Sequence, residues 1–177
     1  EILLEEEVET LFNTCDNSML GIRDKAILSL LYGCGLRRKE VLQLEISEID
    51  LNKGRIHIEK SKTKHARDVP MSKAVQRNIE EYLFNVRNVM LDVNSELTSF
   101  LITERGTKMS NSTLAKVMEK LSQKINIGKT ITCHILRHSI ATHLHRYMTI
   151  EDVAKFLGHK TLDSTMIYTH LKTEYYG

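Results

Sequence analysis

The side chains best suited to chemistry lie in residues 132–170. If this stretch starts as a helix, His134 and Arg137 are three residues apart and share one face, while apolar residues at helical spacing form another. A histidine and an arginine that point the same way from a packed helix can hold an anionic group. His159 and Tyr168 follow along the chain. These four side chains are consistent with a phosphate site that carries its own nucleophile, although structural histidines and a core tyrosine are the more common cases.

Arg37 is a further candidate for holding an anion. It follows Gly35 at the expected start of a helix, where backbone N–H groups also face outward. Glu40 lies one turn further on and is placed to brace the guanidinium group. The alternative interpretation is an exposed Arg–Glu ion pair, which is common on protein surfaces and contributes little to stability.

Basic residues concentrate in one predicted hairpin. Between positions 53 and 67 there is a single acid, Glu59, against six basic residues: Lys53, Arg55, Lys60, Lys62, Lys64 and Arg67. A lysine ammonium group on such a hairpin can donate a proton. The alternative is a solvated loop that contacts DNA phosphates without specificity. Nothing local distinguishes Lys62 from Lys60 or Lys64.

The elements that position these residues are mainly helices. Apolar periodicity predicts further helices over residues 1–11, 23–32, 38–44, 73–89 and 110–125. Three short strands are predicted on either side of the turn at residues 52–54 and just before the single proline, Pro70. The sequence therefore predicts a mainly α fold with one small antiparallel three-stranded β-sheet (α+β).

Composition narrows the class of protein. The 177 residues are 41% hydrophobic and 27% charged, which is ordinary for a globular protein of one domain or two small ones. No apolar run approaches the roughly 18–20 residues that span a bilayer. The first residue is Glu1, with no signal segment, which predicts a piece of a longer protein. A formal net charge of +2 does not by itself indicate nucleic-acid binding. Three widely spaced cysteines fit free thiols in a reducing compartment.

A metal site on the histidines is an alternative that the spacing disfavours. His143 and His145 do not share a helix face with His134 and His138, and no acidic or paired cysteine ligands complete a set. We therefore expect no metal.

The combination of motifs is far more specific than any one of them. In chain order they are Gly35-Leu36-Arg37-Arg38-Lys39-Glu40-Val41, the basic hairpin with Lys62, His134-Ile135-Leu136-Arg137-His138, Leu157-Gly158-His159 and Ile167-Tyr168-Thr169-His170. With these motifs the chain closely resembles the catalytic domain of the tyrosine recombinases (phage integrase family), and within them the Xer-like bacterial branch. The resemblance covers residues 1–177 as one domain and implies that family's fold.

The resemblance implies a catalytic role for six residues. Tyr168 would attack the scissile DNA phosphate, which gives a 3′-phosphotyrosyl link and a free 5′ hydroxyl. Arg37 and Arg137 would bind the non-bridging oxygens, because forked donors suit the charge that develops on phosphorus. His134 would accept the tyrosine proton and His159 would hydrogen-bond the phosphate. Lys62 would protonate the leaving 5′ oxygen, with Lys60 or Lys64 as alternatives.

The resemblance also implies supporting roles and the absence of cofactors. Glu40 would support Arg37, and Arg38, Lys60, Lys64 and Arg67 would contact DNA. A phenol with a pKa near 10 needs a base or a positive field to react at neutral pH, and the arginines and histidines supply both. Because the phosphotyrosine conserves the bond energy, neither ATP nor a metal ion is expected.

Several expectations concern partners. The family implies double-stranded DNA as substrate, a homo-tetramer on DNA for the full-length protein, and a cytoplasmic location without membrane. The family's N-terminal core-binding domain is not in this chain, and few residues follow Tyr168, so we expect this chain alone to be monomeric and to bind DNA weakly. The alternatives are DNA relaxation of the type IB topoisomerase kind, a non-catalytic DNA-binding module, and a metal-binding regulator. Target site, direction of the reaction and accessory factors stay open.

Overall fold

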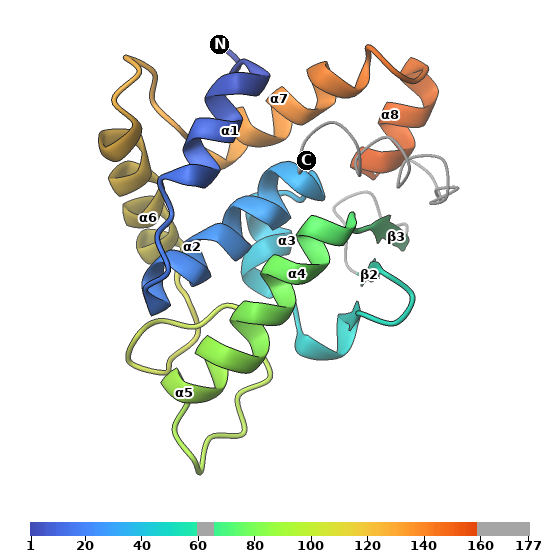
Figure 1. Ribbon diagram of the computed structural model, residues 1–177. Coiled ribbons are helices and arrows are strands. Elements are labelled where there is room, and N and C mark those ends of the chain that lie inside the picture. Colours follow the sequence, from blue (N-terminus) through green and yellow to red (C-terminus); the bar gives the residue numbers. More distant parts are fainter. Residues whose placement is uncertain (60–65, 159–177) are drawn as a thin grey trace.

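The computed structural model describes residues 1–59 and 66–158, and Figure 1 shows the arrangement of its elements. The helical elements are α1 (Glu5–Asn13), α2 (Met19–Leu28), η1 (Ser29–Gly33), α3 (Arg38–Gln43), η2 (Ile46–Glu48), α4 (Lys73–Glu81), η3 (Tyr82–Arg87), α5 (Asn88–Met90), α6 (Asn111–Ile125), α7 (Cys133–Leu144) and α8 (Ile150–Leu157). The strands are β1 (Ile49–Asp50), β2 (Arg55–Ile58) and β3 (Arg67–Pro70). The predicted mainly helical fold with one three-stranded antiparallel sheet is confirmed.

Hydroxyl side chains set where several of the helices begin. In five helices the residue before the first turn is Ser or Thr, and its side-chain oxygen accepts a hydrogen bond from the backbone N–H three residues on: Ser18, Ser72, Ser110, Thr132 and Thr149. The cap at Ser18 starts α2 before the predicted position 23. The helix then continues as the π-helical turn η1 up to Gly33.

Buried and exposed side chains alternate along strand β2 of the sheet. Its order is β1-β2-β3, and Ile56 pairs with Val69 while Ile58 pairs with Arg67. These four side chains are buried, whereas the intervening His57 of β2 is exposed and lies 2.7 Å from an oxygen of its cross-strand partner on β3. The inner face of the sheet therefore buries one arginine among apolar residues.

The core surrounds α2 and η1. Figure 1 shows α2 running between α4 and α6, with α7 passing across one end of this layer. Leu28, Leu30, Leu31 and Tyr32 are fully buried. None of the described helices is long and apolar enough to cross a membrane. The three cysteines are free thiols, and burial raises the pKa of each to about 11 or 12.

A buried polar chain attaches the N-terminal segment to α7. The backbone N–H of Leu3 donates to Ser139 Oγ (2.9 Å), and its carbonyl lies 2.9 Å from His143 Nε2. His143 Nδ1 lies 2.8 Å from the Tyr32 hydroxyl. The simplest assignment is a neutral histidine that donates from Nε2 and accepts at Nδ1. Burial lowers the pKa of His143, in keeping with this neutral form.

Candidate active site

The turn before α3 places Arg37. Gly35 has φ +61°, and a Cβ on it would lie 2.9 Å from Phe156 Cε1, so the turn requires glycine. Arg37 is the N-cap residue of α3, and its backbone N–H donates to Glu40 Oε1 (2.8 Å) at the third position of the helix. The local sequence thus fixes the backbone of Arg37 at the start of α3.

Arg137 joins three segments that are distant in sequence. It projects from α7, and its Nε donates to the carbonyl of Gly35 (2.8 Å) while Nη2 donates to the carbonyl of Leu157 at the end of α8. Burial, and then the neighbouring charge of Arg37, lowers the pKa of Arg137 to about 10. The guanidinium therefore stays protonated at neutral pH, and the structure brings the two predicted phosphate-binding arginines into one electrostatic cluster.

A cleft of about 950 Å³ lies beside these arginines. Its lining comes from the start of α3, the first turns of α7 and one side of α6: Arg37, Arg38, Ala115, Met118, Glu119, Ser122, Gln123, Thr130, Ile131, Thr132, Cys133, His134 and Arg137. Four residues predicted for the site from the sequence therefore line one cleft: Arg37, Arg38, His134 and Arg137. Of these, Arg38 and His134 are exposed, and the His134 ring stacks on His138 at a centroid distance of 6.0 Å.

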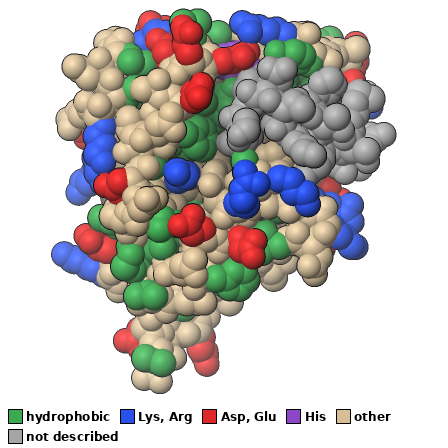
Figure 2. Space-filling view, viewed as in Figure 1, with side chains coloured by type: hydrophobic (Ala, Val, Ile, Leu, Met, Phe, Trp, Pro, Cys, Tyr) green, Lys and Arg blue, Asp and Glu red, His purple; other side chains and the backbone are tan. Residues whose placement is uncertain are grey.

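The cleft is positively charged. Three arginines line it against one acid, Glu119 on α6. On the face drawn in Figure 2, acidic side chains gather around α1 and a group of basic ones lies near the start of α4, so charge is distributed unevenly over the molecule. The formal net charge of the chain is only +2, yet this cleft attracts anions. The local potential, rather than the net charge, steers a polyanion.

Glu40 supports Arg37, but its main partner is Arg67. Arg67 Nη1 and Nη2 lie 2.5 and 2.9 Å from the two carboxylate oxygens, whereas Arg37 Nη1 lies 3.7 Å from Oε2. Burial would raise the pKa of Glu40, but the hydrogen bonds and charges of the two arginines outweigh it and lower that pKa. Glu40 is therefore ionised at neutral pH.

The prediction that Arg67 contacts DNA is wrong for this structure. Its side chain is 1% exposed and lies on the inner face of β3, where its two Nη atoms pair with Glu40 while its Nε is buried without a hydrogen-bond partner among the described residues. The signal that was missed is the alternation of the strand, since Arg67 and Val69 are two residues apart and must share a face.

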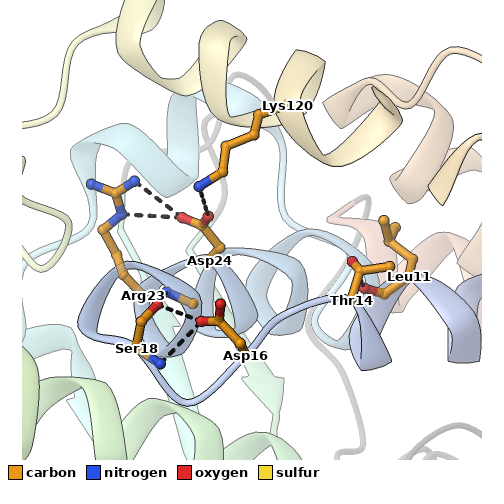
Figure 3. A network of polar contacts seen from close by, with 8 residues as sticks. Leu11, Thr14, Asp16, Ser18, Arg23, Asp24 and Lys120 are labelled. Carbon is orange, nitrogen blue, oxygen red and sulfur yellow. Dashed lines mark hydrogen bonds and ion pairs between the residues drawn. The ribbon is translucent and has the colours of Figure 1, made fainter. Parts of the chain in front are cut away.

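The α6 wall of the cleft is a further feature that the sequence did not indicate. Helix α6 itself was predicted, but not that it would face the two arginines. Lys120 Nζ on α6 lies 3.7 Å from Asp24 on α2, and Arg23 donates to the same carboxylate at 3.1 and 3.2 Å (Figure 3). Burial raises the pKa of Asp24 although these cations oppose it. This network ties the wall to the central helix.

Five predicted residues lie outside the described residues: Lys60, Lys62, Lys64, His159 and Tyr168. Their place relative to the cleft stays a prediction. Within residues 1–59 and 66–158, no group of three or more histidine, cysteine or acidic side chains could hold a metal ion.

The fold is that of a tyrosine recombinase catalytic core. Superposition on the crystal structure of XerA recombinase gives a TM-score of 0.80 at 29% identity, over 96% of this chain and 60% of that one. The XerH site-specific recombinase bound to its difH substrate in a pre-cleavage complex gives 0.72 at 24% identity, over 96% and 50%, and shows the fold alone.

Sequence comparison defines the family. The model of the phage integrase family matches residues 1–174, and the chain belongs to that family. It is similar to the tyrosine recombinase XerD of Oceanobacillus iheyensis, with 32% identity over 172 residues, which are 97% of this chain and 58% of that protein. The chain thus spans little more than half the length of this relative.

Proposed function

We propose that the chain is the catalytic domain of a site-specific DNA recombinase. It cleaves and rejoins DNA strands through a 3′-phosphotyrosyl intermediate on Tyr168, without metal or nucleotide cofactor. The observation that carries this proposal is the convergence of Arg37, Arg137 and His134 on one basic cleft. Family membership and the fold shared with recombinases support it.

Each described residue contributes a distinct physical effect. Arg37 Nη1 is buried and has no hydrogen-bond partner among the described residues, so it keeps a donor for a phosphate oxygen. Arg137 is preorganised by two backbone carbonyls and adds a second positive charge. Fixed donors of this kind stabilise charge that develops in the transition state without reorganising. Their field also favours the phenolate form of a tyrosine, whose ordinary pKa near 10 would otherwise keep it protonated.

The remaining roles belong to the same proposal. His134 is exposed beside the arginines and is the proposed proton acceptor for Tyr168, while Lys62 is the proposed donor to the leaving 5′ oxygen. The proposed partner is double-stranded DNA. A tetramer on DNA is proposed for the full-length protein, and a monomer for this chain alone. XerH, which shares the fold, is described with its DNA substrate.

The test begins by finding the DNA site. The full-length protein is expressed in cells, and covalent protein–DNA adducts that survive denaturant are recovered and their DNA sequenced, with the Tyr168→Phe variant as control. A nicked suicide duplex of the recovered sequence then measures adduct formation with purified protein. Adducts in the wild type that are lost in Tyr168→Phe support the proposal. Adducts that persist in that variant move the nucleophile to Tyr175 or Tyr176.

Two further outcomes distinguish the alternatives. No adduct in cells or with purified protein would leave a non-catalytic DNA-binding module. Adducts together with relaxation of supercoiled DNA, but no exchange between two recovered sites, would indicate chemistry of the topoisomerase IB kind.

A further inference from the structure

The buried ion pair of Glu40 and Arg67, next to Arg37, has more hydrogen bonds than support of Arg37 requires. Glu40 is 4% exposed at its side chain and Arg67 is 1% exposed, and two parallel hydrogen bonds join them. Such fork-to-fork pairs fix both side chains in one geometry. Removing one partner from a buried pair leaves an uncompensated charge, which is strongly destabilising. The orientation of the Glu40 carboxylate is therefore set by Arg67.

This orientation of Glu40 leaves no direct hydrogen bond between its carboxylate and the Arg37 side chain. Three hydrogen bonds already reach the carboxylate: two from Arg67 and one from the backbone N–H of Arg37. The distance of 3.7 Å between Arg37 Nη1 and Glu40 Oε2 is too long for a fourth. A glutamate three residues along a helix would otherwise pair directly with the arginine side chain, as such pairs commonly do. Arg67 thus leaves Arg37 and Glu40 as an ion pair at 3.7 Å without a direct hydrogen bond between their side chains.

Arg67 also meets the end of α8. A Cβ placed on Gly158, whose φ is +111°, would lie 2.7 Å from Arg67 Nη1. The carbonyl of the preceding residue, Leu157, accepts from Arg137. The buried Arg67 and the half-buried Arg137 thus contact adjacent residues at the C-terminal end of α8, so the positions of the two arginines are linked through this helix end.

We propose that Arg67 is a positioning residue for DNA cleavage: it occupies the Glu40 carboxylate so that Arg37 keeps its side-chain donor and charge for the scissile phosphate. The inference rests on the recombinase activity proposed above. Without Arg67, Glu40 would turn to Arg37 and neutralise it, and phosphate activation would be lost although Arg37 itself is unchanged.

The experiment measures the rate of covalent adduct formation by the full-length protein on the suicide duplex, at saturating DNA. Arg67→Met replaces the guanidinium by an apolar chain of similar length. The double variant Arg67→Met with Glu40→Gln removes the free carboxylate as well, while the amide oxygen can still accept from the Arg37 N–H. Arg87→Met is the matched control, because Arg87 is also a buried arginine but donates to the carbonyls of Leu97 and Ser99, away from the cleft.

The proposal predicts a pattern of rescue. Arg67→Met should lower the adduct rate at least about tenfold, and the double variant should recover to within about threefold of the wild type, because the neutral amide cannot neutralise Arg37. Arg87→Met should stay within about threefold per folded molecule. If Arg67→Met does not fold, Arg67→Lys replaces it, since lysine keeps the charge but cannot bind both oxygens.

The outcomes separate this inference from the proposed function. No adduct with the wild type refutes the recombinase activity itself. A wild-type adduct with an unchanged rate in Arg67→Met overturns the positioning role. A lowered rate that the second substitution does not restore shows that Arg67 acts only by stabilising the fold, which also overturns it.

Discussion

Gly158→Ala tests how tightly the end of α8 is packed on the buried ion pair. Gly158 caps α8 with φ +111°, and the added Cβ would lie 2.7 Å from Arg67 Nη1 and 2.9 Å from its Cζ. The backbone strain of a left-handed alanine costs roughly 1–2 kcal/mol. Displacing the guanidinium adds about 2 kcal/mol, below the roughly 3–5 kcal/mol of a broken buried pair. We expect a total loss of about 3–4 kcal/mol.

Gly128→Ala is the matched control for strain. Gly128 also has positive φ, +73°, but a Cβ there meets nothing within 4 Å. The control should therefore lose only about 1–2 kcal/mol. In thermal unfolding of the 177-residue chain, this corresponds to a Tm lower by about 3–6 °C for Gly128→Ala and about 9–12 °C for Gly158→Ala, at roughly 3 °C per kcal/mol.

Urea unfolding of the same variants gives an independent free energy of unfolding. Equal losses in the two variants would refute the reasoning, because they would show that the Arg67 guanidinium yields to the new methyl group without cost.

Three further predictions follow from single contacts. Because burial lowers the pKa of His143, folding favours its neutral form. The stability that His143 contributes is therefore present above its pKa in the unfolded chain, near 6.5, and is lost as pH falls below that value. Between about pH 7 and 5 the urea midpoint should drop less in His143→Asn than in the wild type. Arg38→Ala should weaken DNA binding for all sequences and lower the slope of log K against log salt by about one, as a filter-binding series would show. Arg137→Lys cannot reach both the Gly35 and Leu157 carbonyls, and suicide-substrate cleavage should fall at least about a hundredfold; a change under threefold would contradict its role.

Local patterns predicted most elements of the fold. The helix predicted over 110–125 is α6 (Asn111–Ile125), and the strand predicted before Pro70 is β3. The first predicted strand is instead a short 3₁₀ turn followed by two strand residues, Ile49–Asp50. Apolar residues at 46, 49 and 51 fit either structure, because so short a run does not define a period.

Sequence motifs predicted the candidate site. The prediction failed for a residue whose partner is far away along the chain. Arg67 was counted with the basic hairpin because it is one of six basic residues that stand against a single acid between positions 53 and 67. Its actual partner, Glu40, is 27 residues earlier and becomes a neighbour only when α3 packs on the sheet. The cleft wall on α6 likewise depends on tertiary packing, which periodicity does not encode.

The positive charge of the site depends on contacts that join three separate segments of the chain. Three arginines, Arg37, Arg67 and Arg137, cluster around one carboxylate, which would be unfavourable if the excess charge had no acceptors. Backbone carbonyls supply them: Gly35 and Leu157 accept from Arg137, and neither carbonyl belongs to α7. The positive field therefore forms only when the turn before α3, α7 and the end of α8 are all in place. A variant that loosens any one of these three should weaken phosphate activation before it unfolds the domain, because the field depends on all three junctions and the core depends mainly on α2 and η1.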